Sequence, residues 1–507
     1  MGVKIFPIYK KSLPAAFISL IFAPYMNRII FFVLFLLFGN LVAAQSTEKW
    51  SLMKCYQYAL ANNISIKQTD LQSRFSALTY KQSTLSKYPN ANFQGSVGYG
   101  FGRSENPVTG VLEDQNIFSN SFGFSTQVSL FNWFSKRNKI EADRLTLEAD
   151  VAQIKKAQDD IALNIAVAYL QILLGKEQAN LSSVQIKTTQ EQLYNTRKRV
   201  DAGALPELNA VELEAQLARD SSAYVTADAN VQQLLLQMKA LLNLDAAAAF
   251  DVETPTVDKI PVMSLAEMQP DVVYQLALTS LPQQKINELR LQSAHKTAES
   301  ARGIMYPTFS AFGNLNTRYG YSKIPLYEQV PNGYTISGAR TNVSGTFYNL
   351  EVPAFAIGNK IGNVPISSYG NQLRNNFGQN VGLAISVPIF NSGSARINWE
   401  RAKLNIKQLE LTKDLDNQTL KQNIYRAYND AVAAMQKFNA DKKTVETSEK
   451  ALGFSQKRYD LNLLSTLELI TSQNNLLTAK IQALYSQYDF LFKMKLLEFY
   501  RGQGIKL

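Results

Sequence analysis

The feature that most constrains this chain is an internal duplication, because a layout that occurs twice in the same order allows few folds. Four short segments of the first half recur in the second: 56–60 as 274–278, Tyr88-Pro89 as Tyr306-Pro307, 130–132 as 389–391, and 199–201 as 458–460. The first two pairs share one spacing and the last two share a longer one. The second half therefore contains an insert of about 41 residues between Pro307 and Ile389.

Each half is predicted to run helix, strand, strand, long helix, helix. The predicted helices are 52–87 and 265–305 at the starts, 135–201 and 394–460 as the long helices, and 206–244 and 465–501 at the ends. The first pair stops at Tyr-Pro, because the residue before a proline is displaced from the helical region. The long helices lack proline and are rich in helix-forming residues. About 66 residues at a rise of 1.5 Å reach roughly 100 Å, which is typical of a coiled coil or a tube.

Four segments alternate apolar or aromatic residues with small or polar ones. They cover about 93–101, 121–130, 309–319 and 380–389, and only Phe312 breaks the pattern. A period of two over about nine to eleven residues matches a tilted membrane strand. A soluble sandwich with one wet face would explain the alternation equally well.

Four strands are too few to close a membrane barrel, since the smallest outer-membrane barrels have about eight. Open sheet edges do not occur in lipid, so a membrane-spanning sheet requires several copies of the chain. The sequence itself does not set the copy number. Helices of roughly 100 Å are expected to project into water, because the apolar core of a bilayer is only about 30 Å thick.

The N-terminus is predicted to be a signal peptide. Residues 29–38 form an apolar run too short to span a bilayer, preceded by Arg28 and followed by small residues at 42–44. Cleavage is expected before Gln45, and translation is expected to start at Met26, where a complete signal begins. No other segment is apolar over 18 residues, so no transmembrane helix is predicted.

The composition excludes several classes of function. The chain has one cysteine and one histidine, so an intrachain disulfide or a Cys/His metal site is not expected. Its net charge of +11 includes no run of five or six like charges, which argues against a nucleic-acid arm. No catalytic constellation is found, and we expect neither enzymatic activity nor a cofactor.

The doubled order, the turns at 130–132 and 389–391, and the helix-turn signatures at 199–203 and 458–462 together resemble the TolC-like outer-membrane efflux protein family. The resemblance covers about residues 50–502. It implies a mostly α fold with β, in which four transmembrane strands per chain close a twelve-stranded β-barrel only in a homotrimer, above an α-helical barrel that crosses the periplasm. It also implies a passive duct whose tip docks a periplasmic adaptor protein linked to an inner-membrane pump.

The resemblance also sets the expected domains. Residues 1–44 are the N-terminal extension and signal peptide, 45–250 the first repeat, 251–264 a linker, and 265–507 the second repeat. Within the second repeat, 322–376 is expected to be a long extracellular loop, because barrel loops on that side are long.

The turns at 201–206 and 460–465 are expected to form the periplasmic tip. Gly203 and Asn462 suit tight turns, since both tolerate positive φ. Leu205, Leu463 and Leu464 are candidate adaptor contacts, or they pack within their own helix hairpins.

Similar proteins narrow the tip with acidic rings held closed by polar links from a tyrosine and a basic residue. Tyr459 stands at the tyrosine position and Glu468 at an acidic position, whereas Leu464 and Thr471 depart from the pattern. Three Glu468 side chains around a pore would favour cations. The alternative is an ordinary solvated helix face.

The sequence therefore predicts a passive outer-membrane channel of a tripartite efflux or type I export system. Drug efflux, protein secretion and metal export share this layout and all remain open. The alternative is a periplasmic or surface coiled-coil interaction protein without a channel.

Overall fold

The structure is a computed structural model that describes residues 49–105, 112–255, 263–323, 325–363, 365–461 and 463–502. The predicted signal peptide and half of the predicted linker lie outside these residues. The chain forms two compact units, which we describe separately. Their bounds are Met1–Ile66, Gln158–Val273 and Ile424–Leu507 for unit 1, and Lys67–Ala157 and Tyr274–Asn423 for unit 2.

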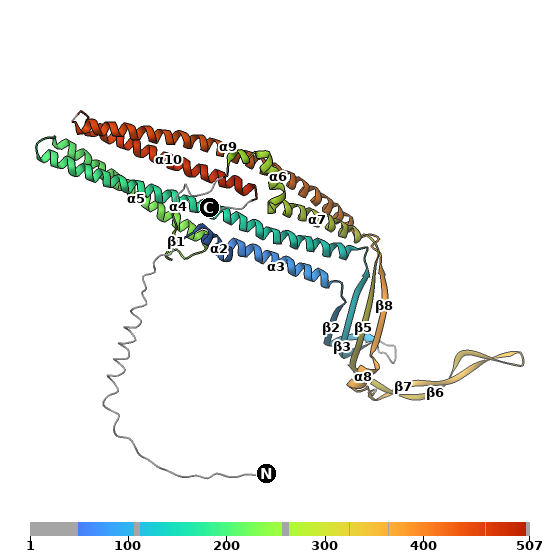
Figure 1. The fold of residues 1–507 in the computed structure, drawn as a ribbon. Helices are drawn as coiled ribbons and strands as arrows, with labels where there is room; N and C mark the ends of the chain where they lie inside the picture. The colour runs from blue at the N-terminus through green and yellow to red at the C-terminus, as the bar shows by residue number, and fades with distance from the viewer. Residues whose placement is uncertain are drawn as a thin grey trace, which may run out of the picture. The chain divides into compact units, whose positions relative to one another are not determined.

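Unit 2 contains a layer of helices whose order follows from their contacts (Figure 1). The layer consists of α3 (Ile64–Leu85), the first part of α4 (Ser135–Asp201), α7 (Pro282–Gly303) and the first part of α9 (Ser394–Asp460). Ser76 of α3 donates to Asp150 of α4 at 2.5 Å. Ser135 of α4 donates to the Ser300 carbonyl of α7 at 2.9 Å, and Asn287 of α7 donates to Asp416 of α9 at 2.8 Å. The order is therefore α3-α4-α7-α9, with α3 and α9 at the two edges.

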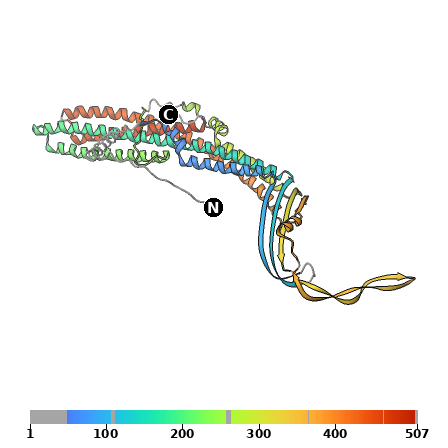
Figure 2. The ribbon, with the colours of Figure 1, turned by 90° about the horizontal axis from the view of Figure 1, so that it is seen from below.

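The main sheet of unit 2 repeats this order. Its antiparallel strands β2 (Asn90–Glu105), β3 (Leu112–Phe131), β5 (Thr308–Ser322) and β8 (Gly378–Ser386) pair as β2-β3-β5-β8. The strands β2 and β5 follow α3 and α7 along the chain, whereas β3 and β8 lead into α4 and α9 (Figure 2). In both layers the segments at the edges are thus the first and the last of unit 2. Among the strands that the structure describes, β2 and β8 each pair on one side only.

The strand register divides the sheet into a polar and an apolar face. Asn92, Ser125, Asn314 and Asn380 stand opposite one another on the polar face. The next row, on the apolar face, contains Phe93, Phe124 and Leu315. Phe312, the exception in the sequence pattern, lies on the polar face with its ring over Gly382, where a Cβ atom would lie 2.8 Å from the ring. The predicted alternation is confirmed.

The insert of the second repeat is more structured than the predicted loop. It forms the antiparallel hairpin of β6 (Pro325–Val343) and β7 (Thr346–Asn363), followed by the short helix α8 (Tyr369–Asn375). The β5 strand extends past the start of β8, and α8 covers the edge that remains. The Gln372 side chain accepts from the Gly320 N–H and donates to the Gly320 carbonyl, both at 3.1 Å.

Unit 1 holds the remaining helices. They are α2 (Leu52–Asn62), α5 (Glu207–Leu242), α10 (Thr466–Tyr500) and the second parts of α4 and α9. The short helix η3 (Leu265–Glu267) and the two-residue strands β1 (Lys49–Trp50) and β4 (Asp251–Val252) also belong to unit 1, whereas α6 (Pro270–Ser280) begins in unit 1 and ends in unit 2. Buried Tyr169 of α4 donates to the Glu253 carbonyl at 2.8 Å and thereby holds the β1–β4 pair against the long helix.

The predicted long helices are confirmed at both ends, and the closing helices agree within two residues. The prediction of one unbroken helix at the start of each repeat was wrong. Asn63 separates α2 from α3, because its side chain accepts from the N–H of Ser65 at 2.9 Å and thereby caps α3. In the second repeat Leu281 precedes Pro282, which begins α7. Within the described part of the chain no helix is long and apolar enough to cross a membrane.

Gly303 tests the close packing of α7 on α4. A Cβ atom at Gly303 would lie 2.8 Å from Ser135 Cβ and 3.0 Å from the Trp133 carbonyl oxygen. We expect Gly303→Ala to lower the free energy of unfolding by about 1–3 kcal/mol, as overpacking does. Guanidinium unfolding of the detergent-solubilised protein measures this free energy.

The matched control is Gly453→Ala, because Gly453 lies in α9 with open space around it. That change should leave stability unaltered or raise it by up to about 1 kcal/mol. Equal effects of the two substitutions would contradict the packing described here.

Candidate functional site

The first candidate site is the pair of helix turns in unit 1. Gly203 has a φ of +76°, which glycine adopts without strain. The Ala204 N–H donates to the Arg199 carbonyl, and the Leu463 N–H donates to the Arg458 carbonyl, both at 2.8 Å. The two turns thus close with the same bond at equivalent positions. Asn462, predicted to share the role of Gly203, lies outside the described residues.

Tyr459 joins the two hairpins of unit 1. Its ring is only 7% exposed, and its hydroxyl lies 3.2 Å from Thr196 Oγ1 of α4 and 3.5 Å from Thr466 Oγ1 of α10. Asn209 of α5 donates to the same Thr466 oxygen at 2.6 Å. The guanidinium of Arg199 lies 5.8 Å from the Tyr459 ring centroid. The basic neighbour of this tyrosine therefore comes from the first repeat and not from position 464, where Leu464 departs from the family pattern.

Glu468 lies in the first turn of α10 and forms a capping box with Ser465. Its carboxylate accepts from the Ser465 N–H at 3.0 Å and from the Ser465 hydroxyl at 2.9 Å, while its own N–H donates to Ser465 Oγ at 3.2 Å. The bonds from Ser465 lower the pKa of the Glu468 carboxyl. Sequence reasoning missed this role, although a serine three residues before a glutamate at a helix start is its usual signature.

The predicted leucines of the tip differ in exposure. Leu463 is 64% exposed, whereas Leu205 and Leu464 are half-buried. Further exposed leucines stand beside the two turns, and sequence reasoning missed them: Leu208, Leu461 and Leu467. We call Leu208, Leu461, Leu463 and Leu467 the tip surface. Large exposed apolar groups that gather in one place are typical of a binding surface.

The second candidate site is the apolar face of the sheet in unit 2, which has an aromatic cluster at each end. The cluster near the helices contains Phe131, Trp133, Phe134, Tyr306 and Phe309. The far cluster contains Tyr99, Phe101, Phe118, Tyr319 and Tyr369. Along β5 the clusters are ten residues apart, roughly 34 Å, or about 25 Å after a tilt of about 45°. This is the height of the apolar band of a membrane barrel.

The band between the clusters is exposed to an unusual degree. Val381, Leu383 and Ile385 of β8 are 86%, 77% and 64% exposed, and Phe93 of β2 is 72% exposed. No residue that the structure describes covers these side chains. Apolar faces of this size are buried against protein or lipid.

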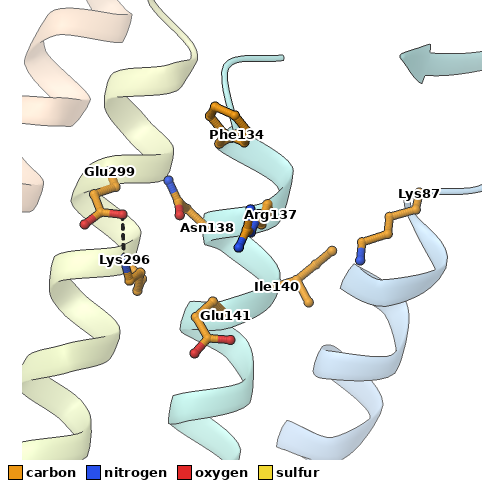
Figure 3. Close-up of a pocket in the computed structure, with 8 residues that line it drawn as sticks. All are labelled: Lys87, Phe134, Arg137, Asn138, Ile140, Glu141, Lys296 and Glu299. Atoms are coloured by element: carbon orange, nitrogen blue, oxygen red, sulfur yellow. Dashed lines mark hydrogen bonds and ion pairs between the residues drawn. The ribbon is translucent and has the colours of Figure 1, made fainter. Parts of the chain in front are cut away.

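A pocket of about 700 Å³ lies at the base of the sheet, between the end of α3, the start of α4 and the end of α7 (Figure 3). It is lined by Lys87, Phe134, Arg137, Asn138, Ile140, Glu141, Lys296 and Glu299. Glu299 is paired with Lys296 at 2.7 Å, and Glu141 accepts from Arg144 at 2.6 Å. Since both acids are held by bases, the pocket offers no free carboxylate pair for acid–base chemistry.

Comparison with known proteins identifies the kind of molecule to which these two surfaces belong. A family model described as outer membrane efflux protein matches residues 55–244 and 363–494. These segments include both tip turns, the strands β2, β3 and β8 of the main sheet, and the long helices α4 and α9. The strand β5 and the helices α6 and α7 lie outside them.

Two relatives and a solved structure agree. The outer membrane efflux protein BepC of Brucella suis is 18% identical over 394 residues, 77% of this chain and 73% of BepC. The alkaline protease secretion protein AprF of Pseudomonas aeruginosa is 21% identical over 419 residues, 80% of this chain and 75% of AprF. A crystal structure of CusC superposes with a TM-score of 0.69 at 16% identity, over 90% of this chain and 93% of CusC.

The capping role of Glu468 predicts a pH dependence. Because the folded protein lowers its pKa below the usual 4.5, the ionised carboxylate stabilises the start of α10 above that pH, and the stabilisation is lost as the pH falls through the folded pKa. Amide hydrogen-exchange protection of the first turn of α10 should fall in acid for the wild type. In Glu468→Gln it should be lower at neutral pH and nearly independent of pH.

Glu191→Gln, an exposed glutamate of α4, is the control and should behave as the wild type. The capping role is contradicted if Glu468→Gln keeps both the protection and its pH dependence.

Proposed function

The chain belongs to the outer membrane efflux protein family, a family of channels and not of enzymes, and from this premise we propose that it is the homotrimeric outer-membrane duct of a tripartite efflux or type I export system. The observation that carries the proposal is the four-stranded sheet with one exposed apolar face and two unpaired edges. The family is located in the outer membrane and extends into the periplasm. The copy number, the closed barrel and the partners are the proposal.

The sheet supplies the first argument for several copies. Its apolar face suits lipid and its polar face suits water, but among the described residues the N–H and C=O groups along the outer sides of β2 and β8 have no strand partner. In lipid each unpaired group costs several kcal/mol. Joining β8 of one copy to β2 of the next pairs both edges without any change in the protomer.

The helix layer supplies a second and independent argument. On α3 the residues Leu71, Leu78 and Leu85 are exposed at a spacing of seven. On α9, at the opposite edge, Ile397, Leu404 and Leu411 are exposed at the same spacing. Two apolar stripes of this period are typical of helices that pack side by side.

Both arguments require the same arrangement of copies. The α9/β8 edge of one copy meets the α3/β2 edge of the next, which is a head-to-tail contact that closes into a ring. Three copies of four strands give the twelve-stranded barrel that we propose. Residues 45–250 and 265–507 then contribute the two repeats of each wall segment, joined by the linker 251–264.

We assign the tip surface to adaptor docking, because it lies around the turns most distant along the chain from the strands. The hairpin within 322–376 then stands outside the cell. Tyr459 ties the two hairpins of each copy together at the narrow end, where Glu468 lines the pore. Cation selectivity of Glu468→Ala channels in planar bilayers tests the pore role, which is wrong if selectivity equals that of the wild type.

BepC is named as an efflux protein and AprF as an alkaline protease secretion protein. Both efflux and protein export therefore remain candidate tasks for this chain. Since the duct is passive, the inner-membrane partner selects the cargo.

Leu78→Glu tests the ring. A glutamate in the α3 stripe would be buried without a partner between copies, and such a charge costs several kcal/mol. We expect the purified protein to lose its trimer in native mass spectrometry. Thr79→Glu is the control, because Thr79 is exposed on the same helix but outside the stripe, and it should remain trimeric. Dissociation of both variants, or of neither, would contradict the proposed edge.

Leu463→Asp tests adaptor docking. Removing an exposed apolar anchor from an interface costs about 2 kcal/mol, which raises the Kd roughly 30-fold. Biolayer interferometry with the periplasmic adaptor from the same genome measures it. Leu236→Asp, a change of an exposed leucine at the far end of α5, should leave the Kd unaltered. A wild-type Kd for Leu463→Asp would remove Leu463 from the docking surface.

A further inference from the structure

The polar face of the sheet has a hollow around one arginine. Its volume is about 700 Å³. The polar residues of its lining come from β2, β3, β5 and the end of α8: Gln94, Ser96, Ser121, Asn316, Thr317, Arg318 and Asn376. The hollow lies within unit 2 and involves the three longest strands of the main sheet.

The register places Arg318 beside hydroxyl groups. Ser96, Ser121 and Arg318 are directly opposite one another on three neighbouring strands. Ser96 Oγ and Ser121 Oγ lie 2.8 Å apart, so one of them donates to the other. The second hydroxyl proton is then left for another acceptor, in the same row and on the same face of the sheet as Arg318.

The described residues around Arg318 include no acidic side chain that could neutralise its positive charge. None of the residues that line the hollow is a carboxylate. Among the sheet positions whose side chains the structure describes, Arg318 is the one charged residue on the polar face. By contrast, Arg144 of unit 2 stands beside Glu141 at 2.6 Å, and Arg74 stands beside Asp70 at 2.9 Å. A guanidinium surrounded by amides and hydroxyls is a donor set for an anion.

The backbone around Arg318 is held in place by α8. Asn376 donates to the Arg318 carbonyl at 2.8 Å. Thr317 donates to the Leu373 carbonyl at 2.6 Å, and Gln372 bonds both backbone groups of Gly320. Neighbouring backbone groups fixed in this way hold a binding group in position. The helix α8 thus fixes the backbone around Arg318 in addition to covering the edge of β5.

We propose that the hollow is an anion-binding site on the wall of the duct, which takes carboxylate, phosphate or sulfonate groups of substrates as they leave. The inference rests on the proposed function, because the polar face lines a lumen only when the copies close the sheet. Three copies then form a ring of three guanidinium groups, an arrangement that attracts anions in pores. It makes Arg318 a determinant of selectivity at the barrel, distinct from the tip.

Planar-bilayer recordings on the purified full-length protein test the site. Reversal potentials in a KCl gradient give the ratio of chloride to potassium permeability, and inorganic phosphate is the probe of binding through its block of the chloride current. We expect Arg318→Gln to lower the permeability ratio about threefold or more and to abolish the block. Arg318→Lys should keep the permeability ratio but weaken the block, because lysine lacks the bidentate fork.

Arg374→Gln is the matched control. Arg374 is an exposed arginine of α8 that does not line the hollow, and its loss should leave both the ratio and the block unaltered. The proposal is overturned if Arg318→Gln channels open normally with the wild-type ratio and block. Absence of any conductance from the wild type would instead contradict the proposed duct, and the site with it.

Discussion

The structure depends on one constraint: a backbone N–H or C=O group in lipid must find a partner within protein. The main sheet offers the membrane an apolar face with an aromatic cluster at each end, yet it leaves β2 and β8 open. A single copy cannot place this face in lipid and also pair the backbone groups of both edge strands. The proposed ring would resolve this conflict, since each copy would supply the next with its missing strand.

The same order of segments in both layers of unit 2 makes the ring geometrically simple. Helices run α3-α4-α7-α9 and strands run β2-β3-β5-β8, so each edge strand continues an edge helix. Closing the sheet therefore brings the apolar stripes of α3 and α9 together as well. Within each copy, Tyr459 and the Glu468 capping box shape the other end of the long helices, where rigid turns present the tip surface. In the proposed ring, the duplication seen in the sequence gives each copy two complementary edges, α3 with β2 and α9 with β8.

Sequence reasoning succeeded where local rules decide the structure. The long helices have no proline and end at turns with a recognisable turn residue, such as Gly203 at positive φ, so both bounds of each were predicted. The break at Asn63 depends on one side chain capping the next helix, and the β6–β7 hairpin has a Gly- and Asn-rich composition that resembles a loop. At the tip, Tyr459 meets Thr196 across 263 residues, a contact that no spacing reveals. The Arg318 hollow likewise needs the pairing of three strands.

The most direct test of this account is the mass and solubility of the mature protein extracted from outer membranes. Native mass spectrometry in detergent should give three copies, and removal of the detergent should precipitate them, because the apolar face has no other cover. A stable monomer in detergent-free buffer would contradict the account, since its sheet would then expose in water the surface that we assign to lipid.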